Sequence, residues 1–97
     1  MNFYAPRDPK EIKKEREMAR ELRDSTWWRD KLREGVCYYC EETFSAGELT
    51  MDHLVPVARG GQSTRSNCVV SCKGCNTAKG TRTAAEWRLE QMTSKKT

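Results

Sequence analysis

The sequence predicts a small α+β domain in which a bound metal supplements a thin hydrophobic core. Three observations predict this class: helix-start signals near the N-terminus, two short apolar stretches separated by a glycine-containing loop, and two Cys-x-x-Cys pairs. The 97 residues allow one domain, and 36% hydrophobic against 33% charged residues leave little material for a core. Chains of this kind usually need a metal, disulfides or a partner subunit to fold stably.

The first predicted element is a highly charged helix. Asp8 is placed as an N-cap, followed by Pro9 at the first helical position and Glu11 three residues after the cap. The helical pattern continues to about Arg23 and has few apolar positions among its many Lys, Arg and Glu residues. We expect this helix to pack lightly on the domain. A second copy of the chain and a nucleic-acid backbone are the alternative partners.

A second, shorter helix is predicted over residues 27–34. Gly35 follows it as a left-handed C-terminal cap, and Trp28 should face the core rather than stack on a base. We divide the chain into an N-terminal charged helix, residues 1–25, and a domain that contains both cysteine pairs, residues 26–97.

The middle of the chain predicts a strand–loop–strand–helix unit. Residues 49–55 and 67–71 are rich in apolar and β-branched side chains, which is typical of short strands. Residues 58–66 between them contain two glycines and several hydroxyl residues, which predicts a loop. A short helix should follow the second cysteine pair and end near Lys79. A last helix over residues 83–92 should open with a Thr-x-x-Glu capping box.

The cysteines predict a structural zinc site. Four of them form two Cys-x-x-Cys pairs: Cys37 with Cys40, and Cys72 with Cys75. The first pair lies in a short predicted hairpin over residues 36–44. Tetrahedral Zn²⁺ takes four thiolates at ~2.3 Å, and four cysteines leave no position open for water, which indicates a structural role. A redox dithiol is the alternative, but neither pair follows a parallel strand at the start of a helix. The fifth cysteine, Cys68, is expected to be a small buried residue.

The distribution of charge indicates a polyanionic ligand. The net charge is +4, and the chain between His53 and Ala85 contains five basic residues and no acidic one. A basic field of this kind suits nucleic acid, although a solvated cationic surface is the simpler alternative. No apolar run is long enough for a signal peptide or a membrane span, so we expect a cytoplasmic protein that does not bind membranes.

The only histidine of the chain lies in this basic region. His53 follows Asp52 on the first predicted strand, and the unit around it can bring Asn67 and Asn76 into the same cleft. A polar packing residue is the simpler interpretation of a single histidine, and a zinc ligand in place of a cysteine is another.

Residues 27–80 resemble the HNH endonucleases, also called ββα-metal or His-Me finger nucleases. The resemblance is carried by the cysteine pairs together with Asp52-His53, Gly60-Gly61, Asn67, Asn76 and Lys79-Gly80. Asn76 takes the place of the family's last histidine, as in the H-N-N variant of the family. The resemblance implies a small ββα-metal domain held together by the four-cysteine zinc site, with the N-terminal helices added to it.

The resemblance also implies roles for individual residues. His53 would be the general base that deprotonates the attacking water, and Asn67 would hold the loop and the imidazole in orientation. Asp52 and Asn76 would bind one divalent cation, Mg²⁺ or Mn²⁺. A neutral imidazole accepts a proton at neutral pH, and a hard cation prefers carboxylate and amide oxygens, so the chemistry agrees. Arg59 and Lys79 are candidates for phosphate contacts. A charged side chain that is simply solvated is an equally good interpretation of each.

These observations predict a metal-dependent DNA endonuclease that hydrolyses phosphodiester bonds and nicks one strand per active site. A zinc-ribbon module that binds nucleic acid without cutting it is the first alternative, and a zinc domain that binds other proteins is the second. We expect DNA as partner, a monomer or homodimer, and a bacterial or phage-like origin.

Overall fold

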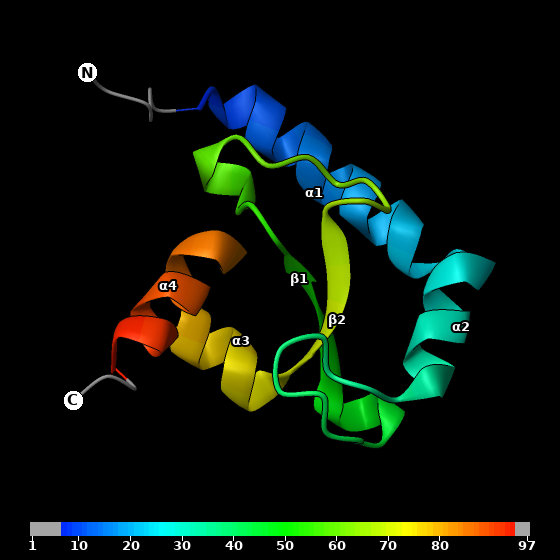
Figure 1. Ribbon diagram of the computed structural model, residues 1–97. Coiled ribbons are helices and arrows are strands. Elements are labelled where there is room, and N and C mark those ends of the chain that lie inside the picture. Colours follow the sequence, from blue (N-terminus) through cyan, green and yellow to red (C-terminus); the bar gives the residue numbers. More distant parts are fainter. Residues whose placement is uncertain (1–6, 95–97) are drawn as a thin grey trace.

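The computed structural model describes residues 7–94 and confirms the α+β class. Within this range, four α-helices surround one antiparallel sheet of two strands (Figure 1). In Figure 1 the strands lie between α2 on one side and α3 and α4 on the other, while α1 runs beside the loop that joins the strands. No helix among the described residues has the length and apolar character needed to cross a membrane.

The two N-terminal helices have the bounds that their capping residues predict. Helix α1 (Pro9–Arg23) starts at Asp8, whose side chain accepts a hydrogen bond from the backbone N–H of Lys10 at 2.8 Å. Helix α2 (Thr26–Glu34) ends at Gly35, which has a φ of 70°. A side chain at this position would be strained, and its Cβ would lie only 2.9 Å from the carbonyl oxygen of Phe44.

The sheet pairs β1 (Leu49–His53) with β2 (Cys68–Cys72) and places Met51 opposite Val70. Strand β1 ends two residues before the predicted 49–55 does, and β2 keeps the predicted length but begins one residue later, after Asn67. The carbonyl oxygen of Asn67 accepts from the N–H of Leu54 at 2.8 Å, and its side-chain oxygen accepts from the N–H of Val55 at 3.0 Å. An asparagine side chain can thus substitute for a backbone partner and end a strand.

Two local expectations need correction. The predicted hairpin over residues 36–44 is only an isolated bridge between Val36 and Thr43. Helix α3 (Lys73–Lys79) begins before Asn76, because Cys72 acts as its N-cap and its Sγ accepts from the N–H of Cys75 at 3.3 Å. The second cysteine pair therefore forms the N-cap and first turn of the helix, whereas the helix was expected to follow the pair.

Helix α4 (Ala84–Ser94) opens with the expected capping box. The hydroxyl of Thr83 accepts from the N–H of Glu86 at 3.1 Å, and the Glu86 carboxylate accepts from the N–H of Thr83 at 2.9 Å. Trp87 is buried and contacts the edge of the Tyr39 ring, with the ring centroids 5.2 Å apart. This contact fixes α4 against the loop that carries the first cysteine pair.

The core is small and includes sulfur-containing residues. Its buried members are Ala19, Trp28, Cys37, Leu49, Met51, Cys68, Val70 and Cys72. Cys68 is only 3% exposed, as expected of a packing residue, and Trp28 faces the core. Ala19 is the member that α1 supplies, and it is 2% exposed. The first helix thus packs on the rest of the chain through a narrow stripe.

Candidate functional site

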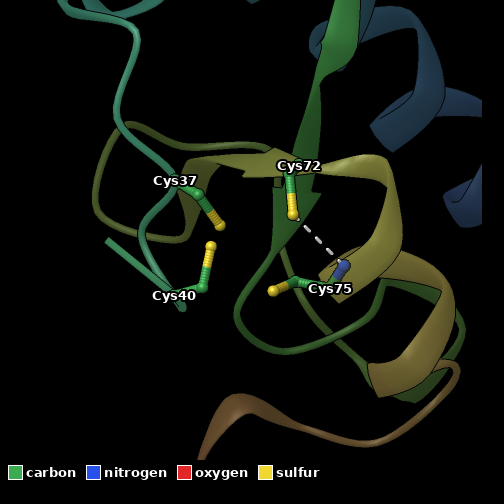
Figure 2. A group of neighbouring side chains, drawn as sticks. All are labelled: Cys37, Cys40, Cys72 and Cys75. Atoms are coloured by element: carbon green, nitrogen blue, oxygen red, sulfur yellow. Dashed lines mark hydrogen bonds between the residues drawn. The ribbon is translucent and has the colours of Figure 1, made fainter. Parts of the chain in front are cut away.

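The two cysteine pairs meet at a single point. Figure 2 shows Cys37 and Cys40 on the loop after α2, facing Cys72 at the end of β2 and Cys75 on α3. Their four Sγ atoms lie within 4.8 Å of one another. Four thiolates around one zinc ion at ~2.3 Å would lie ~3.8 Å apart, so the cluster is close to the required geometry. These four cysteines can hold a metal ion.

The electrostatics of the cluster favour a cation. Burial raises the pKa of the Cys37 thiol, but hydrogen bonds from the backbone of Cys40, Cys72 and Tyr39 outweigh it and lower the pKa to about 6. For Cys75, burial and then the neighbouring Cys72 and Cys37 sulfurs raise the pKa. One thiolate therefore forms readily, while further ones repel it unless a positive ion lies between them.

A cleft of about 450 Å³ brings together most of the other predicted residues. It lies between α1 and the unit formed by β1 and α3, and Asp52, His53 and Asn76 all line it. Lys79 lines it as well. Asn67 is not among the lining residues. Its side-chain N–H₂ donates to the carbonyl oxygens of Val55 at 3.1 Å and Gln62 at 2.9 Å, so it ties the two ends of the loop together.

The imidazole of His53 is oriented by Ser63. Its Nε2 lies 3.0 Å from the Ser63 hydroxyl oxygen, and that hydroxyl donates its own hydrogen to the carbonyl oxygen of Glu15 at 2.6 Å. Since a hydroxyl has one hydrogen, Nε2 of His53 must be the donor in its bond to Ser63. In the neutral ring, Nδ1 is then the nitrogen that is free to accept a proton.

The surroundings of His53 favour its neutral form. Burial lowers the pKa of the imidazole most strongly, Asp52 opposes this, and the positive charge of Arg23 lowers the pKa further. The contacts through Ser63 and Glu15 could not be predicted from the sequence, because 48 residues separate the two positions. The sequence around each of them carries no motif.

Asp52 is a buried carboxylate with two strong partners. Its Oδ2 accepts from the Tyr39 hydroxyl, and it lies 3.1 Å from Nζ of Lys79. Lys79 also donates to the carbonyl oxygen of His53 at 3.1 Å. Burial, and then this bond to Asp52, raise the pKa of Tyr39 above its ordinary value. Tyr39 is a member of the site that no sequence motif predicted.

The two candidates for phosphate contacts serve other groups in this structure. Lys79 is 1% exposed, and its ammonium lies 3.1 Å from Oδ2 of Asp52, whose charge it neutralises. Arg59 lies in the short turn Val57–Arg59 and forms two hydrogen bonds to Glu86 of α4, one of them at 2.9 Å. This pairing lowers the pKa of Glu86 to about 2. Arg59 therefore anchors α4 to the loop.

The ion pair of Lys79 with Asp52 leads to a prediction about stability. Lys79→Met should lower the free energy of unfolding by ~3–5 kcal/mol, because Asp52 would stay buried without its cation. Arg33→Met is the control: it removes an exposed pair with Asp30, at 2.9 Å, and should cost less than ~1 kcal/mol. Urea unfolding of the metal-loaded variants measures both. Equal losses would contradict a special role for the buried pair.

Comparison with known protein families agrees with the geometry. The sequence model of the HNH endonuclease family matches residues 37–92, which is 56 of the 97 residues. The match includes both cysteine pairs, both strands and α3, whereas α1 and α2 precede it. No curated protein matches the chain. The chain belongs to the HNH endonuclease family.

Proposed function

We propose that this protein is a metal-dependent DNA endonuclease that hydrolyses phosphodiester bonds and nicks one strand per active site. Membership of the HNH endonuclease family supports nuclease activity on nucleic acid. The observation that carries the proposal is the cleft: His53, with its Nε2 bonded to Ser63, lines it together with Asp52 and Asn76.

His53 acts as the general base. Its Nδ1 takes the proton of the attacking water, and burial keeps the ring neutral and ready to accept it. Ser63 keeps the ring in the required tautomer, while Asn67 holds the loop from which Ser63 extends. The ring orientation therefore exists before substrate binds, which lowers the cost of reaching the transition state.

Asp52 and Asn76 would hold one divalent cation, Mg²⁺ or Mn²⁺, which when bound supplies Lewis-acid stabilisation at the phosphate. The donor set fits: a carboxylate and an amide oxygen suit a hard cation. Asp52 keeps acceptor capacity despite its partners, because its Oδ1 has only Lys79 at 3.4 Å as a neighbouring donor among the described residues. Zn²⁺ in the cysteine cluster would be structural.

A plasmid assay tests the proposal. Purified protein with Mg²⁺ or Mn²⁺ should convert supercoiled plasmid to the open-circular form before any linear form appears, because each chain carries one such cleft. Linear product in proportion to open circles from the start would show paired cuts by two subunits. Plasmid that stays supercoiled with every divalent metal would reject the nuclease.

A module that binds nucleic acid without cutting it is the second candidate. The observation in its favour is the buried ion pair of Asp52 with Lys79, which already neutralises the predicted metal ligand. This candidate predicts retardation of DNA in a gel with no cleavage, and His53→Ala should then bind as wild type does.

A further inference from the structure

Three arginines of α1 form one wall of the cleft that contains His53. Arg16, Arg20 and Arg23 all line it, and all three are exposed. Their spacing of four and three residues places them on one side of the helix, next to the buried stripe that includes Ala19. Within residues 7–94, no hydrogen bond or ion pair is made by their guanidinium groups.

The charge of the cleft favours an anionic occupant. Its charged lining residues are the three arginines, Lys79 and Asp52, and the last two neutralise each other. Three uncompensated guanidinium groups in one cleft create a strong positive potential, which attracts a polyanion.

The anchoring of α1 holds this arginine wall in place. The side chain of Arg7 donates to the carbonyl oxygens of Gly61 at 2.7 Å and Val57 at 3.1 Å, and it lies 3.8 Å from the Glu15 carboxylate. Glu15 accepts from the N–H of Ser63 at 2.9 Å. The helix is therefore bonded to the same loop that orients His53. These bonds hold the three arginines of α1 in a fixed position relative to the imidazole.

The spacing of the row suits a strand of DNA. At a rise of ~1.5 Å per residue, Arg16 and Arg23 lie ~10 Å apart along the helix axis. One DNA strand carries one phosphate per ~3.4 Å of its axis, so the row can span about three phosphates. A guanidinium group also binds phosphate oxygens with two parallel hydrogen bonds.

We propose that Arg16, Arg20 and Arg23 bind successive phosphates of the DNA strand that is cut, so that α1 guides the backbone to His53. This inference rests on the proposed function of the cleft. Since α1 lies outside the matched residues 37–92, membership of the family does not by itself assign this contact. It assigns to α1 a role in binding substrate as well as in packing.

The test measures binding without cleavage. In a His53→Ala background with no added divalent metal, a fluorescent DNA duplex is titrated with protein at several salt concentrations between ~50 and ~200 mM. The double variant R16Q/R20Q should bind at least about tenfold more weakly and lose ~2 from the slope of log affinity against log salt, roughly 1 per phosphate contact. The single variant Arg23→Gln should lose ~1 from the same slope. It tests the phosphate contacts independently if the double variant misfolds.

The matched control is K10Q/K14Q, which removes the same charge from the far side of α1. Neither lysine lines the cleft, so the slope should change by much less than 1. Equal effects of the two double variants, or no binding at all, would overturn the inference. If wild type cuts plasmid but the arginine variants bind normally, only this inference fails. If they bind weakly and wild type never cuts, the arginine row stands and the nuclease fails.

Discussion

Loss of metal from the four-cysteine cluster is expected to unfold the protein. The core contains few large apolar side chains, and three members of the cluster, Cys37, Cys72 and the partly buried Cys75, belong to it or pack against it. A structural zinc site of this type contributes on the order of 10 kcal/mol to folding, which exceeds the net stability of most small domains. Far-ultraviolet circular dichroism during titration with a strong chelator should show the helical signal disappear, and metal analysis should give one zinc per chain.

Two cysteine variants make this prediction specific. Cys40→Ser removes an exposed ligand and should abolish stoichiometric zinc binding together with the cooperative melting transition. Cys68→Ala removes a buried thiol outside the cluster and should keep the bound zinc. An apo protein that still melts cooperatively would refute the role of the metal.

His53→Ala is expected to lower the rate of plasmid nicking by ~10²–10⁴-fold, because the attacking water would lose its general base. Zinc content and DNA affinity should stay at the wild-type level, since the imidazole belongs to a site separate from the cysteine cluster and its hydrogen bond goes to Ser63. Quantified conversion of supercoiled to open-circular plasmid measures the rate. Activity within a few-fold of wild type would remove His53 from the mechanism.

Ser63→Ala tests the orientation of the His53 imidazole while leaving the imidazole itself in place. One neutral hydrogen bond is worth ~0.5–1.5 kcal/mol, so the nicking rate should fall by roughly two- to thirteenfold. Nitrogen chemical shifts of the imidazole give a second readout: the neutral ring should be the Nε2–H tautomer in wild type and a mixture in Ser63→Ala. An unchanged tautomer would show that Ser63 does not hold the ring.

Elements with strong local signals were predictable from the sequence. Asp8 starts α1, Gly35 ends α2, and the Thr83–Glu86 capping box opens α4, because each of these interactions joins residues close in the chain. The strand ends were not predictable in this way. The sheet stops at Asn67, whose side chain bonds to the N–H of Val55 where a backbone carbonyl would continue the strand pairing. Nothing in the local sequence indicates that the pairing stops at this residue.

Among the candidate site residues, too, some were predictable from the sequence and others were not. The spacing of the four cysteines and the Asp-His pair could be recognised in the sequence, since metal ligands and a general base are limited to few residue types. The partners of these groups could not, because Lys79 meets Asp52, and Glu15 reaches Ser63, only after the chain has folded. The structure also shows ion pairs that the sequence did not predict for the two phosphate-contact candidates: Arg59 pairs with Glu86, and Lys79 pairs with Asp52.

The sequence by itself determined the α+β class, the family, and the four cysteines able to hold a metal ion, because these depend on recognisable residue patterns. Only the tertiary structure decided which nitrogen of His53 is free, what neutralises Asp52, and that three arginines of α1 face the cleft. Those features arise from contacts between segments far apart in the chain, where burial and charge are set by packing rather than by neighbours in sequence.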